Sequence, residues 1–508
     1  MKTHLWKLSP YLVIALVVLI YFIFVAFKFP LHRVGDGMEY YGLYYAWDIS
    51  HRPWMTPQAF EAYDQLVASN QIVGMLPGDF LKQAFPALQL GKTMDFNHFW
   101  FYSFLAFLCN KMAGLLGVHL QIHQSFLMLH CILLTTTTWI SYNFFKWPGV
   151  FIVLLMTFLS PILWFTNKVH TEFFTYCLVL SAVMLIYSKK YIPSALFLAI
   201  ASTQNISFAL IAAIPLLYRV TLERKKPYTL ADVMICSSIA ILILAHPVYY
   251  FSRYGVVSPQ FLAGGASLGG NLSTFYIWLI DPDLGLLPNW PIGLLALLSG
   301  SMLWLFNKQS RQSPINKAYL MFFVFYMLIN FYAHSSTMNL NSGATPGLAR
   351  YALWYLPLAF PPLYWMLNSI NWRQKKFLLI MPLALFLAYF SLKSNNPKKH
   401  ESYTTPTRLS YFIQSKTPWL YNPPEEVFLE RYSGFGESAY ALTIKIVTGP
   451  DCQKLLVFND STKENVTFPE KCHFDASKLR SFIDSKAFSN ERSQYYYLTE
   501  KESNALKK

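Results

Sequence analysis

The stretch "YLVIALVVLIYFIFVAF", Tyr11 to Phe27, is followed at once by "KFPLHRVGDGMEYYGLYYAWD", Lys28 to Asp48. The first part is an uninterrupted apolar run, close to the roughly 20 residues that an α-helix needs to cross a bilayer. No small-residue cleavage site follows it, so we expect an uncleaved first membrane span rather than a secretory signal. The second part places three carboxylates, Asp36, Glu39 and Asp48, among basic and aromatic residues. The chain therefore leaves the membrane directly into a segment rich in ionisable groups.

The rest of the composition continues this pattern. Of the 508 residues, 54% are hydrophobic and only 13% are charged, whereas soluble domains carry about 25% charged residues. Further apolar segments fall near 97–117, 123–144, 148–165, 171–187, 192–218, 230–251, 289–306, 316–333, 351–369 and 376–393. They predict an all-α polytopic membrane protein with about 11 to 13 transmembrane or re-entrant helices.

The net charge of +15 would suit a nucleic-acid-binding protein if the basic residues formed one surface. Instead they occur in short clusters between the apolar segments. The clusters are Lys2 with Lys7, Lys189 with Lys190, Arg224 to Lys226, Lys308 with Arg311 and Lys317, and Arg373 with Lys375 and Lys376. Such clusters stay on the cytoplasmic side and contact anionic lipid. We therefore expect membrane lipids and no nucleic acid as partners.

This orientation has two consequences for the path of the chain through the membrane. Segment 192–218 would have both ends on the cytoplasmic side, so its polar centre "STQNIS", Ser202 to Ser207, predicts a break into two half-helices. Segment 97–144 must cross the membrane an odd number of times, although its pattern resembles two helices. Segment 28–96 then lies outside, and "AFEAYDQLVASNQIV" within it has helical spacing, which predicts helices lying along the membrane interface.

The composition changes after Asn395. We expect a transmembrane domain over 1–395 and a small α+β domain over 396–508, on the extracytoplasmic side, because short apolar runs there alternate with charge. Cys452 and Cys472 lie in this second domain. On the extracytoplasmic side they would form a disulfide, and two free thiols are the alternative.

Asp36 is the first candidate for chemistry, because Gly35 and Gly37 on either side let the backbone bend sharply and a substrate approach closely. A carboxylate beside the low-dielectric membrane gains proton affinity unless a cation or metal offsets it. Such a group could take a proton from a hydroxyl as a general base, with Glu39 close by as a helper. The alternative is that Asp36 only caps the next helix.

The second candidate lies in "SPILWFTNKVHTEFFTY", Ser160 to Tyr176, where Glu172 opens an apolar helix. Glu172 could take part in chemistry, or it could be a first-turn acid that interacts with the helix dipole. Lys168 and His170 next to it would suit a phosphate or pair with Glu172. No P-loop, zinc-ligand cluster or Gly-x-Ser-x-Gly element occurs, so no metal ligands and no definite cofactor are predicted. A divalent metal near the carboxylates stays open.

The layout resembles the GT-C superfamily of membrane glycosyltransferases over roughly residues 5–395. The similarity lies in an Asp just after the first span, a long outer loop, the "DFNHFWFYSFLAF" helix opening, the "SP…TE" turn and a terminal outer domain. The chain is most similar to the bacterial lipid-carrier-dependent branch, which includes the 4-amino-arabinose transferase of lipid A and the protein mannosyltransferases.

The resemblance also implies roles for residues. The family's first-loop acid matches Asp36, with Glu39 as the near alternative, and its second acid matches Glu172. Its histidine before the second helix corresponds to His98, although "NHFWFY" replaces the family's "HPPL" element. In "SGATPGLARYALWYLPLAFP", Ser342 to Pro361, Arg350 would bind the donor phosphate, together with Lys168, His170 or His98. A snorkelling arginine at a helix end is the alternative reading of Arg350.

The implied function is transfer of a sugar, with inversion, from a polyprenyl-phosphate donor (undecaprenyl-linked in a bacterium) to an extracytoplasmic glycan, lipid or protein. The implied location is the bacterial inner (plasma) membrane. The rival hypothesis is a transporter or flippase, because broken helices with polar centres are typical of transporters. The lack of a repeat between the halves and the position of the acids outside the spans favour the enzyme. A glycan polymerase or ligase is a third alternative.

Overall fold

The computed structural model describes residues 9–264, 274–307, 313–335, 337, 340, 345, 347–369, 376–402, 404–433, 446–458, 472–485 and 493–507. Several residues used above, namely Lys2, Lys7, Lys308, Arg311, Ser342, Arg373 and Lys375, lie outside these ranges. The chain forms two compact units. The first comprises Met1–Phe275, Trp290–Met338 and Leu353–Lys399, and the second comprises Tyr276–Asn289, Asn339–Ala352 and His400–Lys508.

The first unit is a helical bundle. Among the described residues, four helices are long and apolar enough to cross a membrane: α1 (Pro10–Lys28), α6 (Ile122–Phe158), α10 (Leu230–Tyr254) and α16 (Pro314–Ser335). Shorter apolar helices accompany them: α7 (Thr171–Tyr187), α8 (Tyr191–Ser202), α9 (Ser207–Leu222), α14 (Pro291–Phe306), α17 (Phe360–Ser369) and α18 (Lys376–Ser394). The chain is an integral membrane protein, and the predicted polytopic helical class is confirmed.

The range of α6 contains two helices, as predicted for 123–144 and 148–165. They meet at a kink at Lys146, whose dihedrals are non-helical (φ 54°), and Pro148 lies just beyond it. Proline lacks an amide hydrogen and its ring crowds the preceding turn, which explains a kink at this point. The helix ends at Phe158, and a 3₁₀ helix, η2 (Pro161–Asn167), follows. The second of the two helices therefore ends before the predicted residue 165.

The structure bears on one of the two features that the predicted orientation requires. Helices α8 and α9 are separate, with 203–206 between them, so the predicted break is confirmed. Helix α5 (Phe101–Leu115) has 15 residues, a length of about 22 Å against about 30 Å of hydrocarbon. It is not among the four candidate spans found in the described part of the chain. How often segment 97–144 crosses the membrane stays a prediction.

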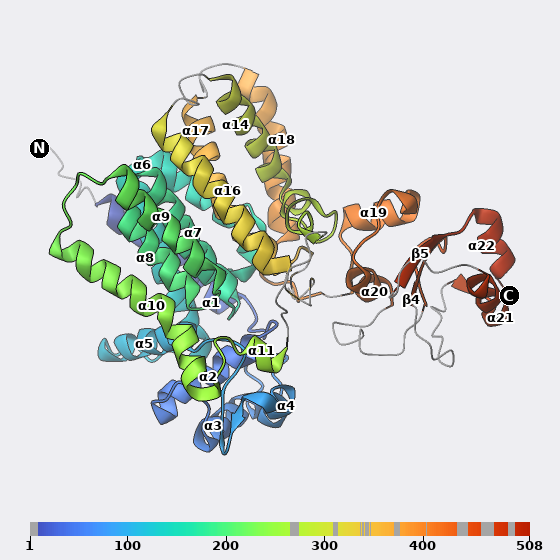
Figure 1. Ribbon diagram of the computed structural model, residues 1–508, viewed down its shortest axis with the longest axis horizontal. Helices are drawn as coiled ribbons and strands as arrows, with labels where there is room; N and C mark the ends of the chain where they lie inside the picture. The colour runs from blue at the N-terminus through green and yellow to red at the C-terminus, as the bar shows by residue number, and fades with distance from the viewer. Residues whose placement is uncertain are drawn as a thin grey trace, which may run out of the picture. The chain divides into compact units, whose positions relative to one another are not determined.

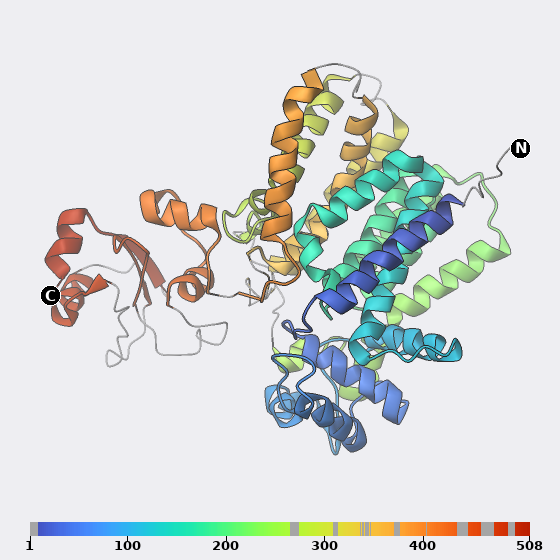
Figure 2. The ribbon, with the colours of Figure 1, turned by 180° about the vertical axis from the view of Figure 1, so that it is seen from behind.

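The long loop after α1 is mostly helical. It contains α2 (Gly37–Ser50), α3 (Pro57–Ala68), α4 (Gly78–Ala84), η1 (Pro86–Leu88) and an antiparallel pair, β1 (Gln89–Leu90) with β2 (Thr93–Met94). Helices α2 to α5 lie together at one end of the bundle, and the short α11 (Gln260–Ala263) lies beside them (Figure 1, Figure 2). The helices are confirmed, and their place along the membrane interface stays a prediction.

The second unit contains the short helices α12 (Ile277–Ile280) and α13 (Leu286–Asn289) and the C-terminal segment. That segment has α19 (Arg408–Lys416), η5 (Pro418–Leu420), α20 (Glu425–Ser433), α21 (Ala476–Asp484) and α22 (Glu500–Leu506) around one sheet. The 3₁₀ helix η4 (Arg350–Ala359) runs from this unit into the first.

The sheet of the second unit has the antiparallel order β3 (Ile446–Thr448), β4 (Lys454–Phe458), β5 (Ser493–Tyr497). Alternate residues of the central strand enter opposite clusters, because Leu455 and Val457 pack on one face and Leu456 on the other. The predicted small α+β region is confirmed, and Cys452 and Cys472 form the predicted disulfide.

Candidate active site

Asp36 occupies the residue before α2 but makes no side-chain hydrogen bond that caps this helix. Gly35 before it has φ +44°, a left-handed conformation that favours glycine. Arg33 fixes this turn by donating to the carbonyls of Gly35 (2.8 Å) and Gly74 (2.9 Å). At Gly37 an added Cβ would lie 3.1 Å from the Val169 carbonyl oxygen. The turn therefore brings Asp36 against segment 168–172 and leaves its carboxylate turned away from the helix cap.

Two imidazoles converge on the Asp36 carboxylate. Its Oδ2 lies 3.4 Å from Nε2 of His98 and 3.6 Å from Nε2 of His170. The other ring nitrogen of each histidine faces a glutamate: Nδ1 of His98 is 2.9 Å from Glu39 Oε2, and Nδ1 of His170 contacts Glu172 Oε2. Asp36 thus stands between two histidine–glutamate pairs, and the structure brings together five of the residues that the sequence pointed to.

Accessibility distinguishes these five side chains. Asp36 is 28% exposed and His98 is 19% exposed, whereas His170, Glu39 and Glu172 are each 2% exposed. A substrate can therefore reach Asp36 and His98, while the two glutamates lie behind the imidazoles. This arrangement fixes the ring orientation of both histidines and leaves Asp36 as the most accessible carboxylate of the cluster.

The charge balance of the cluster favours proton sharing. Burial raises the pKa of the Glu39 carboxyl, the nearby Asp36 charge raises it further, and His98 opposes both through its charge and hydrogen bond. A carboxyl with raised proton affinity next to an imidazole can exchange a proton with it. A proton taken up at Asp36 could then be shared with His98 and Glu39 without leaving the site.

Tyr40 keeps the two histidines apart. Its buried ring lies 5.2 Å from the ring of His98 and 5.8 Å from that of His170, between centroids. Its hydroxyl lies 3.3 Å from Thr171 Oγ1, and its carbonyl accepts from Ser103 Oγ at 2.8 Å. Tyr40 therefore ties α2 to both α5 and the start of α7, with an imidazole on either side of its ring.

The backbone around His98 is held from two other helices. The Tyr250 hydroxyl of α10 donates to the carbonyls of Phe96 (2.9 Å) and His98 (3.3 Å). Gln204, in the break between α8 and α9, donates from Nε2 to the Phe99 carbonyl at 3.1 Å. The polar break predicted from "STQNIS" thus contributes to positioning His98.

The His170 side is anchored through α6. His130 Nδ1 lies 3.1 Å from the Thr166 carbonyl, and His130 Nε2 lies 2.8 Å from the Tyr102 hydroxyl. The backbone amide of Thr171 donates to His170 Nδ1 at 3.0 Å, so His170 caps α7. Sequence reasoning missed Tyr40, Tyr102 and His130, because nothing distinguishes them from the many aromatic and buried polar residues of the bundle.

Two predicted phosphate ligands are placed differently. Lys168 is buried, its Nζ donates to the Pro397 carbonyl at 2.8 Å, and it lies 5.1 Å over the Trp164 ring. Arg350 belongs to the second unit, where its guanidinium lies 5.2 Å over the Tyr351 ring. The phosphate-binding roles of both residues stay predictions.

Asp36, Glu39 and His98 could also hold a metal ion, because one ligand atom from each lies within 4.8 Å of the others. Two carboxylates with one imidazole suit Zn²⁺ or Mn²⁺ better than ions that prefer only oxygen ligands. No motif predicted this set, because the histidine is 59 residues from Glu39 in sequence. Bound there, a cation would lower the proton affinity of the carboxylates and polarise a phosphate or hydroxyl oxygen.

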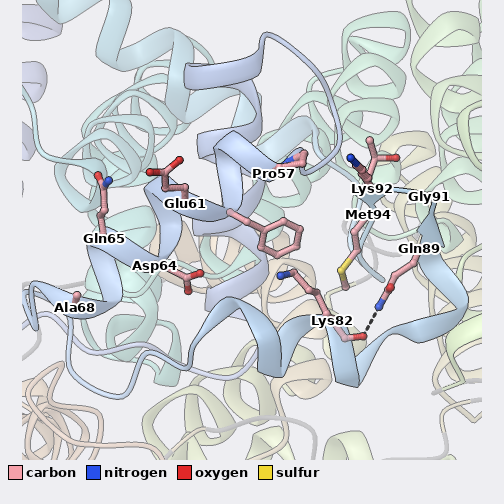
Figure 3. A pocket seen from close by; sticks show the side chains of 12 residues that line it. Pro57, Glu61, Asp64, Gln65, Ala68, Lys82, Gln89, Gly91, Lys92 and Met94 are labelled. Carbon is pink, nitrogen blue, oxygen red and sulfur yellow. Dashed lines mark hydrogen bonds between the residues drawn. The ribbon is translucent and has the colours of Figure 1, made fainter.

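A separate groove of about 720 Å³ lies in the same loop region, between α3, α4 and the β1–β2 pair. Figure 3 shows Glu61 and Asp64 on one of its sides and Lys82 and Gln89 on another, with Gln89 donating to the Lys82 carbonyl at 2.6 Å. None of the predicted site residues lines this groove. The acidic cluster and the groove are therefore distinct features of the loop.

No family model matches the chain, and no curated protein matches it in sequence. Among solved structures, the chain is similar to a crystal structure of ArnT from Cupriavidus metallidurans bound to undecaprenyl phosphate. The sequence identity is 11%, the match covers 76% of this chain and 68% of that chain, and the TM-score is 0.42. Similarity at this level does not place the chain in a family, so the site itself has to indicate the function.

Proposed function

We propose that this chain is a membrane glycosyltransferase of the GT-C type. It transfers a sugar from a polyprenyl-phosphate donor to a hydroxyl-bearing acceptor on the extracytoplasmic side. The observation that carries the proposal is the accessible Asp36 carboxylate between two imidazoles, each backed by a buried glutamate. The cluster lies where the chain leaves α1, at one end of the bundle, a position that a lipid-borne donor could reach from the bilayer.

Asp36 is the general base of the proposed reaction. It accepts the proton of the acceptor hydroxyl while the hydroxyl oxygen forms a bond to C1 of the sugar. The bond between C1 and the phosphate oxygen breaks with its electron pair, and polyprenyl phosphate leaves. A single displacement of this kind inverts the configuration at C1.

The histidines serve the same step in two ways. His98, partly accessible and 3.4 Å from Asp36, can donate a hydrogen bond to the phosphate oxygen on which charge develops. His170 is nearly inaccessible and keeps the Asp36 carboxylate in place. Glu39 at Nδ1 of His98 and Glu172 at Nδ1 of His170 hold the two rings so that each Nε2 faces Asp36.

The proposal is tested with purified protein, a polyprenyl-phosphate donor carrying a radiolabelled sugar, and an extract of extracytoplasmic glycans, lipids and proteins. Transfer of label to an acceptor, with release of unlabelled polyprenyl phosphate, would support the enzyme. Movement of intact labelled donor across proteoliposome membranes without cleavage of the C1–oxygen bond would instead identify a flippase.

A further inference from the structure

A second cavity lies in the first unit, in the region where α7 ends, α8 begins, α9 ends and α16 begins. It has a volume of about 910 Å³. Helix α7 starts beside the acidic cluster at Thr171 and ends at Tyr187, so its 17 residues separate the two sites by about 25 Å. The cavity therefore lies at the end of the bundle opposite to α2 and α5, as the course of α7 in Figure 1 shows.

The rim of this cavity is strongly basic. Five cations line it, against one acid, Glu223. The cations are Lys189, Arg224, Lys225, Lys226 and Lys317. Glu223 already contacts Lys226, and its Oε2 lies 4.0 Å from Arg219 Nε. Within the described parts of the chain no acid lies within ion-pair distance of the other four cations, whose side chains are exposed. The cavity thus keeps an excess of positive charge for an anionic ligand.

The walls of the same cavity are apolar. Leu217, Leu222 and Met321 line it, together with the rings of Tyr191 and Tyr218, whose centroids are 5.7 Å apart. Leu217 is 59% exposed, Leu222 58% and Met321 54%. These three side chains lie on α9 and α16, which are apolar helices of a membrane protein, so acyl chains would cover them. A basic rim above apolar walls matches a molecule with an anionic head and hydrocarbon chains.

We propose that this cavity binds the headgroup of an anionic phospholipid. The phosphate would be held by Arg224, Lys225 and Lys317, with its acyl chains lying along Leu217 and Met321. The charge complementarity and the apolar walls together favour a lipid over a soluble phosphate, which would gain nothing from the exposed hydrocarbon surface. This site is independent of the sugar-transfer cluster, which lies at the other end of α7.

The experiment uses the full-length chain in nanodiscs of phosphatidylcholine with or without phosphatidylglycerol. Native mass spectrometry and titration measure the lipid that the chain retains. The test variant combines Arg224→Gln, Lys225→Gln and Lys317→Gln. The control variant removes the same charge at exposed positions elsewhere, with Lys92→Gln, Lys416→Gln and Lys501→Gln. We expect phosphatidylglycerol to bind the test variant about tenfold more weakly or worse, and the control variant to bind it like the unaltered chain.

Three results would overturn the proposal. One is an equal loss of phosphatidylglycerol in the test and control variants. Another is displacement of the lipid by glycerol phosphate in solution, which would make the ligand a soluble phosphate. The unaltered chain provides a check that needs no variant: it should prefer phosphatidylglycerol to phosphatidylcholine, and this preference should weaken as ionic strength rises. Equal affinity for the two lipids at low salt would also contradict the site.

Discussion

Replacing Asp36 with Asn should abolish most of the activity while leaving the fold intact. The amide keeps the shape of the side chain but cannot accept the proton of the acceptor hydroxyl. Loss of a general base lowers kcat by about 10²- to 10⁴-fold, or about 3 to 5 kcal/mol of transition-state stabilisation at 1.36 kcal/mol per tenfold. Because the base acts only in the transition state, kcat and kcat/KM should fall together.

The fold should tolerate this change for reasons visible in the site. Asp36 is 28% exposed, makes no helix-cap hydrogen bond, and its contacts with His98 and His170 are 3.4 and 3.6 Å long. The loss of such contacts costs at most about 1 kcal/mol.

The assay is the initial rate of transfer from labelled polyprenyl-phosphate sugar, with the melting temperature measured in parallel. Asp48→Asn is the matched control. Asp48 lies on α2, the helix that follows Asp36, and pairs with the exposed Lys111 at 2.8 Å, so its loss should change the rate little. If Asp36→Asn kept a rate close to that of Asp48→Asn, Asp36 would not be the base.

Four further changes test other parts of the account. Glu172→Gln should lower kcat by about 10- to 100-fold, as the loss of a buried partner of an essential imidazole does elsewhere, and an unchanged kcat would exclude the positioning role. Tyr250→Phe removes the hydroxyl that donates to the Phe96 and His98 carbonyls. We expect kcat to fall while KM stays nearly constant. A fall in melting temperature alone would indicate a structural role. In the second unit, burial raises the pKa of Asp281 to about 7. The folded chain therefore keeps a proton that the unfolded chain releases between about pH 4 and 7, so the stability of this unit should fall as pH rises through this range. Asp281→Asn should make the stability less dependent on pH, as measured by the rate of proteolysis of the C-terminal segment. Cys452→Ser opens a loop with a sequence separation of 20 and should destabilise the second unit by about 3 kcal/mol; unchanged resistance of that unit to protease would contradict this.

Much of the helical layout could be predicted because membrane helices follow from apolar length alone. Helix α7 was predicted at its observed bounds, since Thr171 begins it and Lys189 follows its end. The break inside α6 was also predictable, because Pro148 marks a helix boundary and the non-helical residue Lys146 lies two positions before it. The length of α5 required the structure, since the apolar segment 97–117 extends beyond both ends of this helix.

The site was predictable in part and for a similar reason. Asp36 and Glu172 drew attention because acids flanking apolar spans are unusual. Their proximity could not be read from sequence, because it depends on the close approach at Gly37 and on His170 lying between them. Sequence alone also could not assign different roles to the three acids. The assignment depends on burial, because Asp36 is accessible while Glu39 and Glu172 are not.

A cryo-EM map of the chain with a bound polyprenyl-phosphate sugar would test directly whether Asp36 lies at the reaction centre. We expect the sugar–phosphate linkage beside Asp36, with room for an acceptor hydroxyl about 3 Å from its carboxylate and with the phosphate within reach of His98. Density for the headgroup at a site that Asp36 and His98 do not contact would contradict the assignment of this cluster as the reaction centre.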